Sequence, residues 1–465
     1  MTSHIIKIYE RILRKIMVNY LEINSLLSSK QHGFRSGRST LTQLLAHFNR
    51  VYDGLRNDCD TDSIYLDYAK AFDPVDHRLL QLKLVKYKFH PKLVEWIYSF
   101  LSDRLQEVVV NGAHSYKDQI RSGVPQGTVL GPVLFIIFIN DLEGQIANSN
   151  IAFFADDTRL TKRVSSINHT AELQEDLETV RRWSVENNMK LHQQKFELII
   201  HRANPNSMNH ELPFTCELST YRVSDDLQLY PSSALRDLGV VVSADGSWSE
   251  HIHQIAVKAR SVAAWVLSVF RTRDRDAMMT LYKSLVRSHL EYCCPLWHPY
   301  KVQDIQTLEN VQRYFTKRIF GMSRVTYWDR LKLLRLMSLQ RRRERYILIH
   351  MWKILYLLVP NDIGVEFRSP SRLGVQAVIP RLIRDGRLAN QMMFEKSFAV
   401  IGPRLWNGLP AELTIIESQN SFKNQLTDFL LDIRDEPPVV GYPRRDNNSL
   451  TEMSLRGGHQ IDDLQ

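Results

Sequence analysis

The sequence predicts an α+β fold in which helices pack around short buried strands. Two patterns carry this prediction. Apolar residues recur at helical spacing in several segments, and within residues 170–187 the apolar side chains form one continuous stripe along the expected helix. Short apolar runs bounded by turn residues predict strands, and the segments 106–111 and 115–121 on either side of Asn111-Gly112 predict a β-hairpin.

Composition and charge are those of a globular protein with a basic excess. Of the 465 residues, 44% are hydrophobic and 24% are charged, which argues against a mostly disordered or fibrous chain. A chain of this length is expected to hold about three domains. Lys and Arg number 60 against 51 Asp and Glu, and the resulting net charge of +9 hints at a polyanionic partner without identifying one.

The cysteines and the apolar segments bear on location. No two of the four cysteines form a C-x-x-C pair, and Cys293 and Cys294 are adjacent, so neither a zinc cluster nor a disulfide framework is expected. Residues 1–17 lack the apolar core of a signal peptide. The most apolar stretches, 129–139 and 346–359, are too short or carry charge. We therefore expect an intracellular protein with no membrane span.

The remaining elements follow from periodicity and turn residues. Helices are expected at 5–21, 41–55, 77–101 with a break near Pro91, and 128–142. Strands are expected at 62–68, in two pieces at 150–160, near Leu198 and at 238–242. The pattern from 248 to 340 is helical and basic and ends in an arginine run at 341–345, residues 346–432 are mixed, and the composition from 435 onward is typical of a disordered tail.

Two buried strands each end in an acidic residue. Apolar residues 151–154 precede Asp156-Asp157, and apolar residues of the strand at 62–68 precede Asp67. Burying acids at strand ends is costly unless a cation is present. If the two strands lie side by side in one sheet, their carboxylates converge and could hold two Mg²⁺ ions about 4 Å apart. The alternative interpretation is a pair of solvated turns.

The chain contains four strings in the order found in reverse transcriptases of non-LTR retrotransposons, namely QHGFRSGRST (31–40), YLDYAKAFDPVDH (65–77), SGVPQGTVLGPVLFIIFINDL (122–142) and IAFFADDTRL (151–160). It looks most similar to jockey-type and related LINE elements. The similarity continues through MKLHQQKFELI (189–199), LRDLGVVVSADGSWSEHI (235–252), LVRSHLEYCCPLWHPY (285–300) and FAVIGPRLWNGLP (398–410), and so covers most of residues 8–430.

This resemblance implies a catalytic set. Asp67 and Asp156 would be the main ligands of two Mg²⁺ ions, with Mn²⁺ as an alternative, and Asp157 would assist them. The alternative role for Asp157 is that of a turn residue capping the hairpin. Lys195 matches the lysine proposed to protonate pyrophosphate, although the preceding residues 192–194 depart from the family pattern.

The resemblance also implies substrate contacts. Phe72 would stack under the sugar and exclude a ribose 2′-hydroxyl, and its alternative role is core packing. Gln126 and Gly127, in the loop with Gly123 and Pro125, would lie beside the incoming nucleotide, unless this is an ordinary loop entering a helix. Arg35 and Arg38, in the basic loop, would contact the triphosphate. The alternative is that they belong to a solvated surface turn.

The fold implied is a right-hand polymerase, with partial fingers at 1–60, an antiparallel palm sheet at 61–246, a basic helical thumb at 247–345, a C-terminal region at 346–434 and a disordered tail at 435–465. Expected partners are an RNA template, a DNA primer or target and dNTPs, in the nucleus and cytoplasm as a ribonucleoprotein. The resemblance begins late in the family's fingers. The alternative function is therefore an inactive, truncated fragment that only binds RNA or an RNA–DNA duplex.

Overall fold

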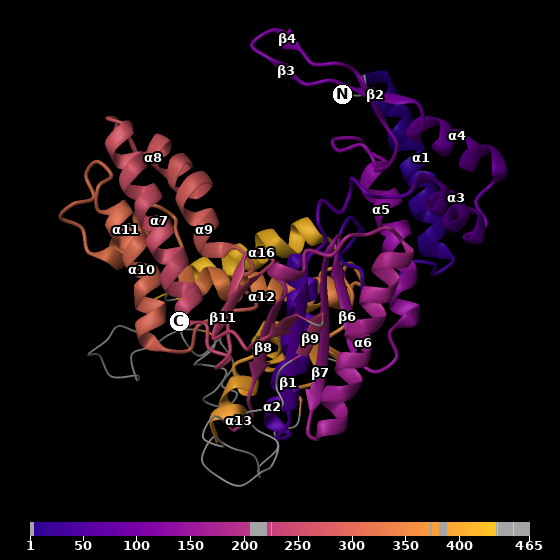
Figure 1. The fold of residues 1–465 in the computed structure, drawn as a ribbon. Coiled ribbons are helices and arrows are strands. Elements are labelled where there is room, and N and C mark those ends of the chain that lie inside the picture. The colour runs from indigo at the N-terminus through magenta and orange to yellow at the C-terminus, as the bar shows by residue number, and fades with distance from the viewer. Residues whose placement is uncertain are drawn as a thin grey trace. The chain divides into compact units, whose positions relative to one another are not determined.

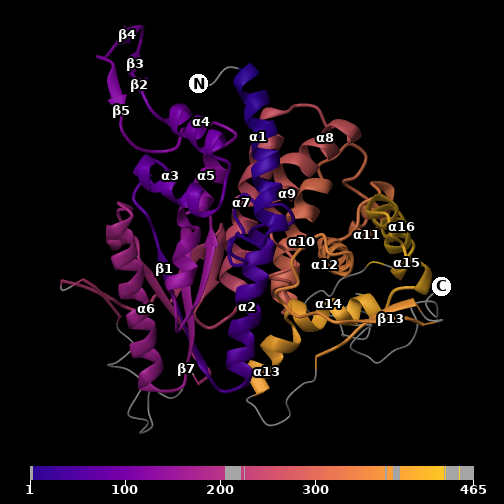
Figure 2. The ribbon, with the colours of Figure 1, turned by 90° about the vertical axis from the view of Figure 1, so that its right-hand side faces the viewer.

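The computed structural model describes residues 4–204, 221–224, 226–371, 374–380, 388–433, 435 and 450. The chain divides into two compact units (Figures 1 and 2). Unit 1 comprises residues 1–43 and 59–232, and unit 2 comprises residues 44–58 and 233–465.

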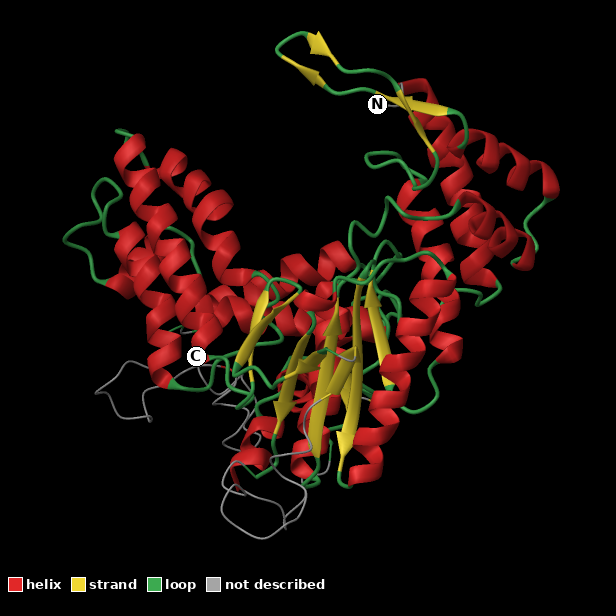
Figure 3. Ribbon diagram, in the orientation of Figure 1, coloured by secondary structure: helices red, strands yellow, loops and turns green. Residues whose placement is uncertain are grey.

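A four-stranded antiparallel sheet lies at the centre of unit 1 (Figure 3). Its strands, in order across the sheet, are β6 (Asn150–Phe154), β7 (Asp157–Val164), β1 (Asp60–Leu66) and β8 (Glu197–His201). The register sets Ile64 of β1 opposite Leu160 of β7 and Leu198 of β8, and all three side chains are buried. The central strand β1 is buried along most of its length because it has a neighbour on each side.

Helices complete the core of unit 1. They are α1 (His4–Ile23), α3 (His77–Lys86), α4 (Pro91–Leu101), α5 (Gly131–Ile139), the 3-10 helix η1 (Asn140–Gln145) and α6 (Ile167–Glu186), which packs along β7. Every residue of α5 except Pro132 is buried, so this helix is apolar all round. Short strands form paired extensions: β2 (Arg104–Gln106) with β5 (Asp118–Ile120), β3 (Val109–Val110) with β4 (Ala113–His114), and β9 (Tyr221–Ser224) with β10 (Leu227–Leu229).

Helix α1 has its isoleucines on the solvent side. Periodicity predicted the helix, and it forms, but Ile5, Ile8, Ile12 and Ile16 are each more than half exposed. The face that contacts the core carries Met17 and Leu21 instead. The spacing of apolar residues therefore predicted the helix without identifying its buried face.

Unit 2 is mainly helical. It contains most of α2 (Thr40–Arg56), then β11 (Ala234–Asp237), β12 (Val240–Ser243), α7 (Ser249–Val269), α8 (Arg275–Leu281), the π-helix η4 (Tyr282–Val286), α9 (Arg287–Glu291), α10 (Val302–Thr316), α11 (Tyr327–Leu333) and α12 (Leu339–Leu355). It continues with β13 (Phe367–Ser371), β14 (Gly374–Ala377), α13 (Leu388–Glu395), α14 (Phe398–Asn407), α15 (Ala411–Thr414) and α16 (Gln419–Asp432). Its core includes the buried rings of Trp297, Trp352 and Trp406.

The arginine run at 341–345 lies partly inside unit 2. Arg341 and Arg343 are 1% and 0% exposed, because α12 is packed against α10, α14 and α16. Arg342 forms an ion pair with Glu291. Arg341 and Arg343 are therefore core residues of unit 2, although the sequence placed them in the basic helical segment expected to form the thumb.

The predicted α+β class is confirmed by this mixture of helices and strands. The strand preceding Asp67, the hairpin at 150–160 and the helix at 170–187 all form, with boundaries shifted by a few residues. In the described part of the chain, no helix combines the length and hydropathy needed to cross a membrane. The predicted tail at 435–465 lies outside the described residues apart from Asp435 and Leu450, and the division into fingers, palm and thumb stays a prediction.

Candidate active site

Asp67 and Asp156 lie at the same end of the central sheet. Asp67 directly follows β1, whose last residue, Leu66, is paired with Thr158 of β7. Asp156 lies in the turn between β6 and β7, immediately before Asp157, the first residue of β7. The antiparallel register therefore brings the end of β1 beside this turn, which is the arrangement that the apolar residues before both acids had suggested.

The two carboxyl groups are close enough for one charge to affect the other. Burial raises the pKa of Asp156, and the negative charge of Asp67 raises it further. Burial also raises the pKa of the neighbouring Tyr68 hydroxyl, and the charge of Asp156 adds to that rise. Asp67 and Asp156 are each partly buried, so solvent screens their repulsion only in part. A cation at this end of the sheet would stabilise both carboxylates.

Lys195 places one cation beside this pair. Its Nζ lies 2.9 Å from Oδ2 of Asp67. Lys195 ends the 3-10 helix η2 (Gln193–Lys195), and backbone hydrogen bonds hold this segment against the strand end. The amide of His192 donates to the carbonyl oxygen of Asp67 over 2.8 Å, and the amide of Ala69 donates to that of Lys190 over 2.8 Å. The structure thus joins Lys195 to Asp67, although they are more than 120 residues apart in the sequence.

Asp157 differs from the other two acids in being exposed. Among the described residues, no group of three or more His, Cys, Asp or Glu side chains is arranged so that it could hold a metal ion. The donor chemistry of Asp67 and Asp156 still fits a hard divalent cation, since carboxylate oxygens are its preferred ligands and the cation would relieve their repulsion. A contribution from Asp157 stays a prediction.

Phe72 lies between the core and the basic loop at 31–40. Its ring stacks on Phe135 of α5, with centroids 4.4 Å apart and an interplanar angle of 21°. It meets Phe34 edge-on, with centroids 6.3 Å apart and an angle of 88°. Phe72 is half-buried, so it combines core packing with a partly exposed ring. Its predicted contact with the nucleotide sugar stays a prediction.

The loop at 122–127 packs its backbone against the turn after Phe72. The amide of Val124 donates to the carbonyl oxygen of Phe72 over 2.9 Å. Gly123 adopts a φ of +89°, and a Cβ at this position would lie 2.6 Å from the carbonyl oxygen of Asp73. Only glycine fits this position without moving the backbone. The close approach places the loop beside Phe72, as the predicted nucleotide site requires.

Gln126 and Gly127 occupy the exposed end of this loop. Nε2 of Gln126 donates to Oδ1 of Asp73 over 3.3 Å. Gly127 has a φ of +81° and faces open space. Asp73, in the turn before Pro74, therefore holds the loop that carries Gln126. The contact of Gln126 and Gly127 with a nucleotide stays a prediction.

Gln31 and Gly33 hold the turn that carries Asp156, and sequence reasoning did not single them out. Oε1 of Gln31 accepts hydrogen bonds from the amide of Ala155 over 3.0 Å and from that of Gly33 over 2.7 Å. A Cβ on Gly33 would lie only 2.3 Å from the amide nitrogen of Ala155. The Q-x-G spacing in the loop was the sequence feature that could have identified these two residues, but it does not show what the loop contacts.

Arg35 and Arg38 hold their own loop. The guanidinium of Arg35 donates to both carboxylate oxygens of Glu22, over 2.8 and 2.5 Å, and to the carbonyl oxygen of Ser28 over 2.5 Å. Its side chain is only 7% exposed. Arg38 donates to the carbonyl oxygen of Ser29 over 2.7 Å. The predicted triphosphate contact of both arginines stays a prediction, and for Arg35 it would require the ion pair with Glu22 to open.

Glu10 of α1 is a further positioning residue that the sequence did not reveal. Its carboxylate is buried and accepts hydrogen bonds from the amides of Val129, over 2.6 Å, and Leu130, over 3.0 Å. These amides immediately precede α5, where a carboxylate also stabilises the helix dipole. The contact ties α1 to the segment that directly follows Gly127. Nothing in the spacing of α1 distinguished this acid from a surface residue.

Comparison with known proteins gives consistent results. Residues 1–241 match the family described as "Reverse transcriptase (RNA-dependent DNA polymerase)". The "RNA-directed DNA polymerase from mobile element jockey" of Drosophila melanogaster is 28% identical over 326 residues, which are 68% of this chain and 34% of that protein. The "Probable RNA-directed DNA polymerase from transposon X-element" of the same species is 26% identical over 327 residues, with the same coverage.

The chain spans about a third of the length of these curated relatives. Among solved structures, telomerase from Candida tropicalis with a fragment of telomeric RNA aligns with a TM-score of 0.41 and 10% identity, over 91% of this chain and 56% of that one. Apo telomerase from the same species aligns with a TM-score of 0.39 and 10% identity, over 77% of this chain and 59% of that one.

Proposed function

Because the chain belongs to the reverse transcriptase (RNA-dependent DNA polymerase) family, we propose that it is an RNA-directed DNA polymerase of a non-LTR retroelement. It would extend the 3′-hydroxyl of a DNA primer or nicked target with dNTPs, copying an RNA template. The observation that carries this proposal is the meeting of Asp67, Asp156 and Lys195 at one end of the antiparallel sheet.

Asp67 and Asp156 would hold the divalent cations, with Asp157 assisting. When bound, two Mg²⁺ ions, or Mn²⁺ in their place, would make the primer hydroxyl more acidic and neutralise the triphosphate. The repulsion that raises the pKa of Asp156 supports this assignment, because acids that repel each other gain most from a shared cation.

Lys195 would donate a proton to the leaving pyrophosphate. Such a donor must lie next to the reacting groups, and the ion pair with Asp67 holds the ammonium at the candidate site. The Lys195 side chain is 62% exposed, so it is accessible to a substrate phosphate. In this proposal Lys195 exchanges its contact with Asp67 for one with the pyrophosphate as the cations bind the acids.

Phe72, Gln126 and Gly127 would position the incoming nucleotide, and Arg35 and Arg38 would contact its triphosphate. The stack on Phe135 fixes the plane of the Phe72 ring, which a steric test of the sugar requires. The hydrogen bond from Gln126 to Asp73 links the loop to the same turn. The partly exposed ring and the exposed loop end support a nucleotide site at this position.

Primer extension on poly(rA)/oligo(dT) with dTTP and Mg²⁺ tests the proposal. We expect the protein to extend the primer and Asp156→Asn to abolish extension, while RNA affinity changes less than severalfold. The matched control is Asp118→Asn, which removes one exposed carboxylate from the β2–β5 hairpin of the same unit. The control should extend primer at the wild-type rate.

Two results would contradict the proposal. Undiminished extension by Asp156→Asn would reject the assignment of the acids. Absence of extension by the unaltered protein, together with tight binding of an RNA–DNA duplex, would favour the alternative of a chain that only binds nucleic acid. A cooperative thermal transition for each variant distinguishes loss of chemistry from loss of folding.

A further inference from the structure

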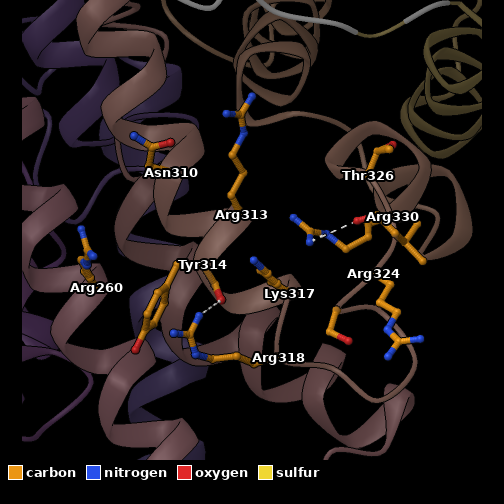
Figure 4. A pocket seen from close by; sticks show the side chains of 11 residues that line it. Arg260, Asn310, Arg313, Tyr314, Lys317, Arg318, Arg324, Thr326 and Arg330 are labelled. Carbon is orange, nitrogen blue, oxygen red and sulfur yellow. Dashed lines mark hydrogen bonds between the residues drawn. The ribbon is translucent and has the colours of Figure 1, made fainter.

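Unit 2 contains a basic pocket that the polymerase proposal does not use (Figure 4). It has a volume of about 640 Å³ and lies between α10, α11 and the segment that joins them, with α7 at its rim. None of the described residues that line it is acidic. Six cationic side chains do, namely Arg260, Arg313, Lys317, Arg318, Arg324 and Arg330.

The described residues supply no counterions for these cations. In the described parts of the chain, no carboxylate forms an ion pair with any of the six. Lys317, Arg318 and Arg324 are exposed, and Figure 4 shows Lys317 between Tyr314 on one side and Arg324 on the other. Six positive charges around one concavity repel each other, so a bound polyanion would stabilise the pocket.

Arg330 gives independent evidence of a ligand. Its side chain lines the pocket and the residue is only 5% exposed, yet its Nε has no hydrogen-bond partner. Among the described residues, its side chain makes a single long hydrogen bond, 3.5 Å from Nη1 to the carbonyl oxygen of Val325, and its guanidinium carbon lies 5.6 Å from the centre of the Tyr327 ring. Burial lowers the pKa of Arg330, and the charge of Arg313 lowers it further. A buried cation with so few partners is costly, and an anion in the pocket would supply the missing ones.

Tyr314 adds an aromatic surface to these charges. The guanidinium carbon of Arg318 lies 3.7 Å from the centre of the Tyr314 ring, and that of Arg260 lies 5.3 Å from it. Aromatic rings and guanidinium planes are the groups on which unpaired bases stack, and a groove of positive charge follows the phosphates of a single strand. The pocket has the volume of a small-ligand site, which suits one or two nucleotides and not a duplex.

We propose that this pocket binds an unpaired segment of nucleic acid, with its phosphates on the cations and a base against Tyr314. The choice of nucleic acid as the polyanion rests on the proposed function. The site would hold single-stranded RNA or DNA on residues of unit 2, whereas the candidate catalytic acids belong to unit 1. This proposal therefore assigns a role to individual residues of the basic helical segment, whereas the sequence predicted only that the segment as a whole is basic.

Salt-dependent binding tests this assignment. Fluorescence anisotropy of the whole protein with a labelled 12-nucleotide oligo(U) is compared between wild type, Lys317→Gln/Arg324→Gln and a control, Arg271→Gln/Lys332→Gln. All four residues are exposed, and both control residues lie outside the pocket. Each lost phosphate contact lowers the slope of log affinity against log salt by about 0.7 for a single strand, so we expect the pocket variant to lose about 1.4 in slope. The control should retain the wild-type slope.

Further measurements distinguish an unpaired strand from a duplex and from a free nucleotide as the ligand of the pocket. Tyr314→Ala should weaken oligo(U) binding more than Tyr314→Phe, because only the first removes the ring. An equal loss of slope for a blunt RNA–DNA duplex would overturn the unpaired-strand proposal in favour of a duplex contact. Displacement of oligo(U) by dTTP at matched phosphate concentration would overturn it in favour of a free-nucleotide site.

The inference and the proposed function can fail separately. An equal slope for the pocket and control variants would overturn the inference, whether or not the protein extends a primer. Absence of primer extension by the unaltered protein would reject the proposed function, while a slope loss confined to the pocket variant would still support the single-strand site.

Discussion

The substitution Gly33→Ala tests whether the basic loop fixes the position of Asp156. Gly33 does not adopt a positive φ, so its backbone accepts alanine, and the strain comes from the added methyl group alone. The Cβ would lie 2.3 Å from the amide nitrogen of Ala155, whereas ordinary contacts begin at 3.4 Å. Relief of this overlap requires a movement of about 1 Å, and a misplacement of that size can cost about 100-fold in rate, or about 2.7 kcal/mol.

The assay is kcat/KM for dTTP on poly(rA)/oligo(dT), measured beside the matched control Gly144→Ala. A Cβ at Gly144 meets nothing within 4 Å and its φ is not positive, so the control should retain wild-type activity. Wild-type kcat/KM for a folded Gly33→Ala protein would refute the reasoning. If Gly33→Ala does not fold, Gln31→Met provides a second test, because it removes the acceptor of the Ala155 amide without adding a clash and should also slow extension.

Three further predictions follow from the same geometry. Phe72→Val should raise incorporation of ribonucleotides relative to deoxyribonucleotides in single-turnover extension, and unchanged discrimination would leave Phe72 with core packing alone. Lys195→Met and Lys195→Arg should both lower the extension rate about 100-fold, since arginine keeps a charge beside Asp67 but does not give up a proton; a near wild-type rate for Lys195→Arg would argue that only the charge matters. Burial raises the pKa of Asp62 from 3.8 to about 6, so the folded protein binds a proton on this carboxyl more tightly than the unfolded chain does. The folding stability that this difference contributes is fully present below pH 4 and is lost as the pH rises through 6. Asp62→Asn keeps an acceptor for the Tyr221 hydroxyl and should raise the free energy of unfolding by about 3 kcal/mol at pH 7 but not at pH 3.5, as measured by urea denaturation.

The sequence could predict the acid pair because local patterns determine its position. Apolar runs ending in Asp67 and in Asp156 predict buried strands, and strands that end in acids can converge only if they share a sheet. The observed register between β1 and β7 meets that condition. The helix at 170–187 was equally predictable, since one apolar stripe is sufficient to bury a helix against a sheet.

Contacts between distant segments could not be predicted in this way. No local pattern indicates that Glu10 binds the amides immediately before α5, or that Glu22 forms an ion pair with Arg35. The burial of Arg343 shows the same limit, because a run of arginines has the same local pattern on a surface as inside a helical core. Such positions depend on which helices meet, and a single sequence does not specify that.

Several contacts at the candidate site hold backbone in place around side chains that remain accessible. Gln31 binds the amide of Ala155, and Gly123 lets its loop approach Asp73, yet neither contact uses the carboxylates of Asp67 or Asp156. Burial and the charge of Asp67 make Asp156 costly to keep charged, and Lys195 forms its ion pair with Asp67. A site selected for stability alone would replace one acid with a neutral residue. A backbone held by these hydrogen bonds beside a pair of neighbouring acids is the arrangement that the proposed binding of divalent cations requires.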